Sequence, residues 1–94
     1  MNLEYVCLFD YYGELLTDKQ KTYFKDYYFN NLTLQEIADN NKVSKNAVHK
    51  NIKEILSKLD FYEEKLKLYS NKKKIENLIK NIDVDIQHKI KELI

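Results

Sequence analysis

Arginine, proline and tryptophan are absent from this 94-residue sequence, and glycine, cysteine and methionine each occur once. With no proline and only one glycine, the chain lacks the residues that most often interrupt helices, so helices are favoured almost throughout. The single cysteine, Cys7, excludes an internal disulfide, and we expect it to be a small buried side chain on an apolar stripe with Leu3 and Val6. These features predict an all-α protein.

Signatures of membranes, metals and catalysis are missing as well. No apolar run approaches the roughly 20 residues that cross a bilayer, and no signal peptide is evident, so we expect a cytoplasmic protein without membrane insertion. The sequence contains no P-loop, no CxxC and no HExxH motif. His49 and His88 lie far apart, with no ligand cluster near either. We therefore predict that the protein is not an enzyme and that it binds neither a metal nor another cofactor.

The length is sufficient for one hydrophobic core without disulfides or metals, because small domains commonly need such additional stabilisation only below roughly 70–80 residues. We predict a single domain over residues 1–94. Within it, residues 17–58 form a helix-turn-helix core, and residues 59–94 form a helical extension that serves packing or dimerisation.

The segment 34–52, LQEIADNNKVSKNAVHKNI, has the spacing of a helix-turn-helix. Thr33 is followed three residues later by Glu36, which is the capping-box pattern at the start of a helix. The small Ala38 allows a second helix to cross closely above the first. A polar break follows, from which Val43 is expected to return to the core, and Ser44 is a typical N-cap for the second helix.

The second helix of this motif divides into two faces. Ala47, Val48 and Ile52 form its apolar side by helical spacing. In a helix-turn-helix the opposite side enters the DNA major groove, with its N-terminal residues nearest the bases. The residues that we predict to bind nucleic acid lie on that side or in the preceding turn: Lys42, Ser44, Lys45, Asn46, His49, Lys50 and Lys53.

The charge distribution supports this prediction. Residues 1–41 hold seven acids and three lysines (net −4), residues 42–58 hold five lysines and one glutamate (net +4), and residues 59–94 come to +1. The positive charge therefore lies where a phosphate backbone would run, although a solvated helix face also carries lysines. The fold is used for protein contacts too, so a protein-interaction role remains the alternative.

The absence of arginine bears on specificity. Arginine is the usual bidentate reader of guanine, whereas lysine neutralises phosphate as a point charge. Asn46 is suited to pair with adenine. We expect a weak or A·T-leaning preference with strong salt dependence, although an A/T-rich genome would also explain the missing arginine.

The flanking segments also read as helices, over about residues 2–12, 18–29 and 34–40. Gly13 marks the end of the first. Thr17 and Gln20 form a second capping box. The aromatic stripe at the next helix is typical of a core, and it consists of Tyr23, Phe24, Tyr27 and Tyr28.

The fourth helix is predicted to run without a breaker from Ser44 to Ser70 and Asn71. Such a helix of about 26 residues is about 39 Å long, more than a compact helix-turn-helix covers. Its second half must therefore pack on the first helix, on the C-terminal region or on a second subunit. Its apolar residues follow a heptad: Val48, Ile52, Ile55, Leu59, Tyr62, Leu66 and Tyr69.

The C-terminal segment is predicted to form the last helices, with Ser70 and Asp83 as caps. An isoleucine stripe at steps of three and four requires a partner surface. We expect five or six helices in all, and a homodimer through the heptad or through this stripe. The stripe consists of Ile75, Ile79, Ile82, Ile86, Ile90 and Ile94.

Two resemblances extend this interpretation. Region 4 of bacterial sigma factors, a helix-turn-helix that reads promoter DNA, is similar to residues 15–58. That likeness rests on Leu16-Thr17-x-x-Gln20, Leu32-Thr33-x-x-Glu36-Ile37-Ala38 and Val43-Ser44-x-x-Ala47-Val48. Nearly the whole chain resembles the YlxM family, through Leu8-Phe9-Asp10-x-Tyr12, Leu15-Leu16-Thr17-x-Lys19-Gln20, Tyr27-Tyr28, Ser44-x-x-Ala47-Val48, Asn51-Ile52-Lys53 and Tyr62-Glu63-Glu64-Lys65-Leu66-x-Leu68.

The YlxM resemblance implies a small bacterial DNA-binding protein with a regulatory or accessory role in the signal recognition particle pathway. As an alternative to DNA, it implies that the particle's GTPase, or its RNA, is the partner. Of the two nucleic acids, DNA is the first expectation and RNA the second. Two positions depart from the pattern. Lys42 stands where the turn usually has Gly or Asn, so either Asn41 takes the left-handed conformation or the turn is strained by about 1–2 kcal/mol. Lys45 stands where relatives often have arginine.

Overall fold

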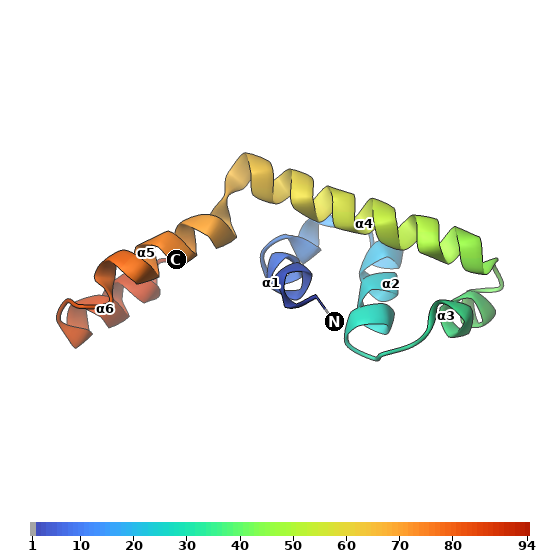
Figure 1. The fold of residues 1–94 in the computed structure, drawn as a ribbon, viewed down its shortest axis with the longest axis horizontal. Coiled ribbons are helices and arrows are strands. Elements are labelled where there is room, and N and C mark those ends of the chain that lie inside the picture. Colours follow the sequence, from blue (N-terminus) through green and yellow to red (C-terminus); the bar gives the residue numbers. More distant parts are fainter. Residues whose placement is uncertain (1) are drawn as a thin grey trace.

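The computed structural model describes residues 2–94, and these residues form helices without any strand (Figure 1). The prediction of an all-α fold is therefore confirmed. A short 3₁₀ turn, η1 (Gly13–Leu15), follows the first helix. In chain order the α-helices are α1 (Leu3–Tyr12), α2 (Asp18–Tyr28), α3 (Leu34–Asn41), α4 (Lys45–Leu66), α5 (Leu68–Ile79) and α6 (Val84–Lys91).

The caps predicted for α2 and α3 are present. The hydroxyl of Thr17 accepts from the backbone N–H of Gln20, whose side chain accepts from the N–H of Thr17 in return. Thr33 and Glu36 form the same reciprocal pair at the start of α3. These bonds satisfy N–H groups that have no partner inside the helix, and so they fix where each helix begins.

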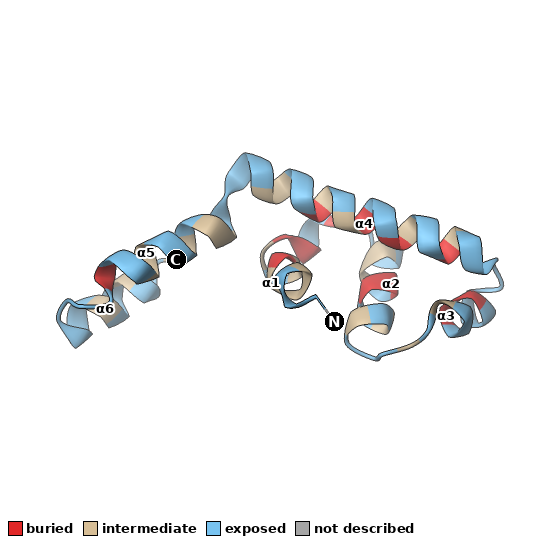
Figure 2. Cartoon of the chain, in the orientation of Figure 1, coloured by how far each residue is buried: buried red, intermediate tan, exposed pale blue. Residues whose placement is uncertain are grey.

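The helix α4 runs along one side of the molecule, and α1, α2 and α3 pack against its inner face (Figure 1). The buried residues of α4 lie on this inner face, whereas its outer face is exposed (Figure 2). Between α1 and α2, the rings of Phe9 and Phe24 stack with centroids 4.3 Å apart. The main core consists of Leu8, Tyr12, Leu16, Tyr23, Phe24, Ile37, Ala38, Val48, Ile52, Ile55 and Leu59.

The inner face of α1 is only partly the expected one, which was a stripe of Leu3, Val6 and Cys7 with Leu8 and Phe9 as further candidates. Leu3 is exposed and Cys7 only partly buried, whereas Leu8 and Tyr12 are buried. The sequence offers apolar residues on several sides of this helix, and the aromatic partners from α2 and α4 select the side that Tyr12 occupies. Val43, expected in the core, is likewise exposed, because the turn into α4 carries it outward.

The predicted aromatic core of α2 is confirmed only in part. Tyr23 and Phe24 are buried, whereas Tyr27 is exposed and Tyr28 is half-buried. The latter two lie in the last turn of α2, and they line a groove described below.

The predicted length of α4 was wrong. The helix ends at Leu66, because Lys67 adopts the left-handed conformation (φ 55°), and α5 starts at Leu68. Ser70, expected to be a cap, lies inside α5. In place of a local cap, the carboxylate of Glu63 accepts from the backbone N–H groups of Tyr69 and Ser70, at 3.2 and 2.9 Å.

The heptad residues of α4 do not form a free seam. Val48, Ile52, Ile55 and Leu59 are buried within the chain's own core. Tyr62 packs partly against that core, and Leu66 is exposed. The first helix packs against the second half of α4, where Tyr5 and Tyr12 of α1 donate to Asp60 and Glu63.

Beyond the joint at Lys67, α5 and α6 extend away from α2 and α3 (Figure 1). Asp83 caps α6 as predicted, since its carboxylate accepts from the N–H groups of Asp85 and Ile86. Of the isoleucine stripe, Ile79 is buried, whereas Ile82 and Ile86 are exposed. No helix among residues 2–94 is both long and apolar enough to span a membrane.

Candidate nucleic-acid interface

The turn between α3 and α4 is ordered by backbone and side-chain hydrogen bonds. Lys42 takes the left-handed conformation (φ 57°), while Asn41 stays helical. The N–H of Val43 then donates to the carbonyl of Ala38 at 3.1 Å. The hydroxyl of Ser44 accepts from the N–H of Ala47 at 3.0 Å and caps α4. The motif thus has the helix-turn-helix geometry, with lysine in the strained position.

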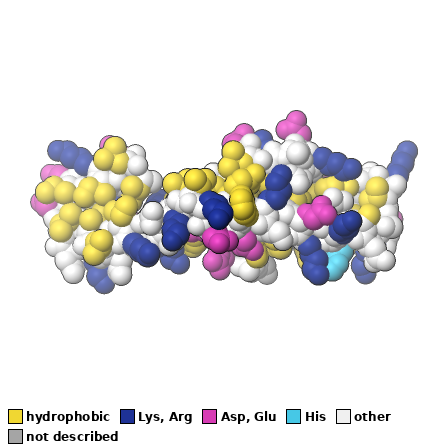
Figure 3. Space-filling model, turned by 90° about the horizontal axis from the view of Figure 1, so that it is seen from above, with side chains coloured by type: hydrophobic (Ala, Val, Ile, Leu, Met, Phe, Trp, Pro, Cys, Tyr) yellow, Lys and Arg dark blue, Asp and Glu magenta, His cyan; other side chains and the backbone are white. Residues whose placement is uncertain are grey.

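All seven residues predicted to bind nucleic acid are exposed: Lys42, Ser44, Lys45, Asn46, His49, Lys50 and Lys53. They lie in the turn and the first three turns of α4, away from the buried ridge of Val48 and Ile52. Viewed onto the outer face of α4, lysine side chains surround a histidine near one end of the molecule (Figure 3). The helix end therefore combines exposed cations with the partial positive charge of its own N-terminus.

The outward residues of α4 share one shallow surface. Asn46, His49, Lys50 and Lys53 line an open depression of about 630 Å³, together with Glu54, Ser57 and Lys58. Lys58 is tied to the scaffold, since its ammonium donates to the side chain of Gln20 at 3.1 Å. An open surface of this kind suits an extended partner rather than an enclosed small molecule.

The lysines of this surface are available for an external anion. Over residues 2–94, the side-chain ion pairs within 4.0 Å join Lys21 to Glu14 and Lys72 to Glu76. Lys45, Lys50 and Lys53 therefore have no carboxylate partner in the described part of the chain. Their charges are not neutralised within the protein, so they remain free to pair with phosphate.

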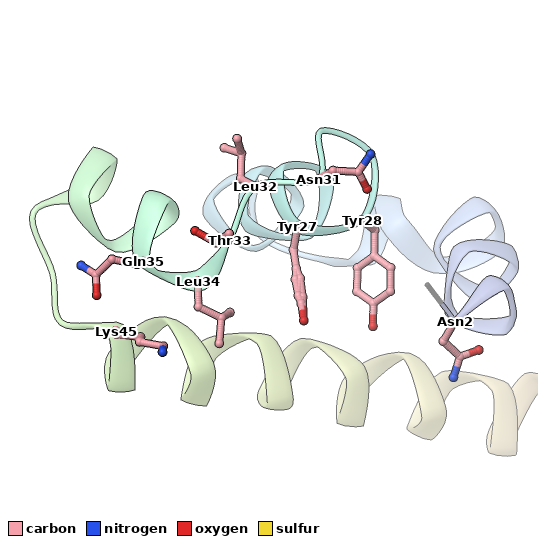
Figure 4. Close-up of a pocket in the computed structure, with 9 residues that line it drawn as sticks. All are labelled: Asn2, Tyr27, Tyr28, Asn31, Leu32, Thr33, Leu34, Gln35 and Lys45. Atoms are coloured by element: carbon pink, nitrogen blue, oxygen red, sulfur yellow. The ribbon is translucent and has the colours of Figure 1, made fainter.

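Lys45 borders a second hollow, which the sequence did not reveal (Figure 4). Tyr27, Tyr28 and Leu34 line this groove of about 660 Å³, and Asn31 at its edge has a positive φ of 54°. Burial and the neighbouring Tyr27 raise the pKa of Tyr28 above its ordinary value. The aromatic periodicity of α2 predicted that Tyr27 and Tyr28 belong to the core. No sequence signal marks where the neighbouring helices start and end, so the groove could not be predicted.

No metal site accompanies these surfaces: within residues 2–94, no three His, Cys, Asp or Glu side chains are placed to hold a metal ion. The surface of α4 offers ammonium, amide and imidazole groups, whose chemistry is hydrogen bonding and charge pairing with phosphates and base edges.

Comparison with known proteins identifies the family. Residues 1–94 match UPF0122, described as "Putative helix-turn-helix protein, YlxM / p13 like". A UPF0122 protein of Malacoplasma penetrans is 55% identical over 60 residues, which are 64% of this chain and 56% of that protein. A UPF0122 protein of Fusobacterium nucleatum is 42% identical over 83 residues, 88% of this chain and 81% of the relative. A UPF0122 protein of Bacillus pumilus is 47% identical over 75 residues, which are 80% of this chain and 68% of that protein.

The match to the family extends over the whole chain, and it agrees with the likeness to YlxM that the sequence motifs indicated. The alignment to the Malacoplasma protein spans little more than half of that relative, whereas the one to the Fusobacterium protein spans most of it. The chain therefore belongs to the UPF0122 family of YlxM/p13-like helix-turn-helix proteins.

Proposed function

We propose that this protein is a DNA-binding helix-turn-helix regulator. The observation that carries the proposal is the position of the unpaired lysines: they occupy the exposed N-terminal half of α4, the helix that enters DNA in this motif. The contact residues of the proposal are Lys42, Ser44, Lys45, Asn46, His49, Lys50 and Lys53. No catalytic step is part of it.

Within this proposal the residues divide by role. Asn46 and Lys50 face the base edges, and an asparagine amide matches the hydrogen-bonding pattern of adenine. Lys42 and Lys53 contact phosphates on either side. Lys45 lies at the helix N-terminus, where the helix dipole adds to its attraction for a phosphate.

Double-stranded DNA is the preferred nucleic acid for geometric reasons. The major groove of B-form DNA is about 12 Å wide and admits an α-helix. The corresponding groove of A-form RNA is deep and narrow, and side chains do not read it. The exposed α4 is a single helix presented on its own side of the molecule, which fits the first shape (Figure 1).

The wider setting of the proposal is bacterial transcription in the cytoplasm. Helix-turn-helix proteins commonly bind as dimers to half-sites about 34 Å apart, and we propose a homodimer here also. We propose that residues 17–58 supply the DNA contact and that residues 59–94 supply the helical extension through which two copies associate.

A second candidate is a protein-interaction module for the signal recognition particle. The observation in its favour is apolar: Phe61, Leu66 and Leu68 are each about half exposed near the α4–α5 joint. Nucleic-acid surfaces are polar and basic, whereas exposed leucine and phenylalanine favour a protein partner. The YlxM resemblance makes the particle's GTPase, or its RNA–protein complex, the partner to test.

Fluorescence anisotropy over a salt series tests the first candidate, with an A·T-rich duplex and a structured RNA as probes. We expect micromolar or tighter binding of the duplex, lost in the double variant Lys45→Ala/Lys50→Ala. The matched control is Lys74→Ala/Lys80→Ala, which removes the same charge from the opposite end of the molecule and should bind normally. An unmodified protein that fails to bind the duplex at low salt would contradict the proposal.

The second candidate has its own readout. Pull-down of the signal recognition GTPase should be abolished by Phe61→Ala/Leu66→Ala and unchanged by Lys45→Ala/Lys50→Ala. Loss of the pull-down in the lysine variant alone would assign the contact to the α4 N-terminus instead of the apolar joint.

A further inference from the structure

We infer that α5 and α6 form the surface that binds a second copy of this chain, with α6 antiparallel to α6 of the other copy. This inference rests on the dimeric form of the regulator proposed above and names its contact surface. Its first support is exposure: α6 has no buried residue. We call α5, α6 and the turn between them the hairpin. Five of its large aliphatic side chains are exposed to solvent, with exposed fractions of 81% for Leu78, 39% for Ile82, 62% for Val84, 50% for Ile86 and 84% for Leu93.

Four of these side chains form a patch close to the size that an interface needs. Hydrophobic atoms gather over the end of the molecule that α5 and α6 form (Figure 3). Val84 lies on the opposite side of α6 from Ile86, and the exposed parts of the other four side chains amount to roughly 400 Å², within the range of the largest apolar patch of an ordinary monomer. Two copies together would bury roughly 800 Å² of apolar surface, and the polar groups around it bring the contact toward the roughly 1,000 Å² of a specific interface.

The other apolar seam of the chain is already occupied. Val48, Ile52, Ile55 and Leu59 of the α4 heptad are buried by the chain's own helices. An eight-residue helix such as α6 is marginal in water unless tertiary contacts hold its apolar side. A second copy supplies those contacts, whereas Val48, Ile52, Ile55 and Leu59 are already covered within the chain.

Charge identifies the occupant. Residues 68–94 hold six lysines and four acids, net +2, and this positive charge comes from Lys72, Lys73 and Lys74 of α5; residues 83–94 around α6 hold three acids and two lysines, so α6 itself does not favour an anionic membrane or nucleic acid. Asp85 and Lys89 stand one turn apart beside Ile86. When two copies of α6 pair antiparallel about a twofold axis, Asp85 of one copy lies opposite Lys89 of the other, and the reverse holds too. A parallel pairing would place like charges together.

The position of the hairpin is compatible with the proposed DNA contact. The molecule is 54 Å long, and α5 and α6 lie at the opposite end from the α3–α4 turn (Figure 1). Association through the hairpin therefore leaves the outer face of each α4 free.

Sedimentation velocity of the full chain at tens of micromolar tests the surface. We expect a dimer whose Kd rises at least about tenfold in Leu78→Glu/Leu93→Glu, since burial of large apolar side chains drives association. The matched control, Leu3→Glu/Leu15→Glu, places the same charges on exposed leucines outside the hairpin and should dimerise normally. Circular dichroism melts confirm that each variant remains folded.

Charge exchange tests the antiparallel arrangement. Asp85→Lys alone and Lys89→Asp alone should each weaken the dimer severalfold, because each change places like charges opposite one another twice per dimer. The double variant Asp85→Lys/Lys89→Asp should recover the original Kd. Mixing the two single variants should give a heterodimer more stable than either homodimer.

Two results would overturn the inference: a monomer at these concentrations, or a dimer whose Kd is unchanged in all the hairpin variants. Anisotropy with duplex DNA is an independent readout. A monomer that binds DNA would overturn the dimer surface and leave the DNA-binding function standing. A dimer that depends on the hairpin but does not bind DNA would support the dimer surface and contradict the DNA-binding function.

Discussion

Among residues 2–94, three non-glycine residues hold the left-handed conformation, and two of them are lysines at helix ends. Lys42 ends α3 and Lys67 ends α4, with φ of 57° and 55°. A side chain in this conformation costs about 1–2 kcal/mol, which glycine avoids at the expense of a more flexible unfolded chain. These positions set the path of the chain through both turns.

We therefore expect Lys42→Gly and Lys67→Gly each to raise the free energy of unfolding by about 0.5–1 kcal/mol. Urea denaturation measures both. The pair also separates stability from function, because Lys42→Gly removes a proposed phosphate contact and should weaken duplex binding, whereas Lys67→Gly should not. A loss of stability in both variants would show that the lysine side chains contribute contacts larger than the backbone strain.

Tyr5 couples stability to pH. Its hydroxyl donates to Asp60 at 2.8 Å, and this bond, with partial burial, raises the pKa of Tyr5 to about 12 from the ordinary value of 10.0. The native state holds its proton where the unfolded state has lost it, so the stabilisation is complete below pH 10 and is lost as the pH rises toward 12. We expect Tyr5→Phe to flatten this alkaline decline, measured as urea midpoints between pH 8 and 11.5. A decline of the same slope in the variant would assign it to other groups.

At the scale of elements, the α4–α5 joint is stabilised by Tyr12, a residue of α1 that is distant in the sequence. The hydroxyl of Tyr12 donates to Glu63 at 2.6 Å and accepts from the N–H of Leu68 at 3.0 Å. Together with the bonds from Glu63 to Tyr69 and Ser70, this arrangement satisfies the N-terminus of α5, which has no cap of its own. Burial, followed by the bond to Glu63, raises the pKa of Tyr12.

We expect Glu63→Ala to lower the free energy of unfolding by about 1–2 kcal/mol, as for a lost cap, and Tyr12→Phe by about 1 kcal/mol. Because the two groups share one network, the double variant should lose less than the sum. The exposed Glu64→Ala is the control and should change stability by under about 0.5 kcal/mol. Additive losses in the double-mutant cycle would separate Tyr12 from the joint.

This joint also shows what the sequence could predict. Starts of helices were predictable at Thr17, Thr33 and Asp83, because a cap is a local hydrogen bond between near neighbours. The break at Lys67 was not, since no glycine or proline marks it and Tyr12, which holds it, lies far away in the sequence. The exposure of the α4 residues proposed to bind DNA likewise followed from local helical periodicity. The groove beside Lys45 depends instead on how the end of α2 meets the starts of α3 and α4.

For the whole molecule, the decisive feature is the separation of its two ends. The turn and first part of α4 carry the net charge of +4 in residues 42–58, whereas α5 and α6 carry only +2 over residues 68–94 at the other end of a 54 Å molecule. Long-range attraction of a polyanion should therefore orient the α3–α4 end toward it. Binding strength should depend on lysines near that end and hardly at all on those of α5.

Salt dependence tests this polarity directly. If Lys42, Lys45 and Lys53 each neutralise a phosphate, a plot of log K against log salt should have a slope of about −2.7 per bound copy. Lys53→Ala should reduce its magnitude by about 0.9, because one fewer counterion is released. Lys80→Ala, which removes an equal charge from the far end, should leave the slope unchanged. Equal effects of the two variants would mean that nucleic acid lies along the whole molecule, and the proposed division between a DNA-binding end and a dimerising end would then be wrong.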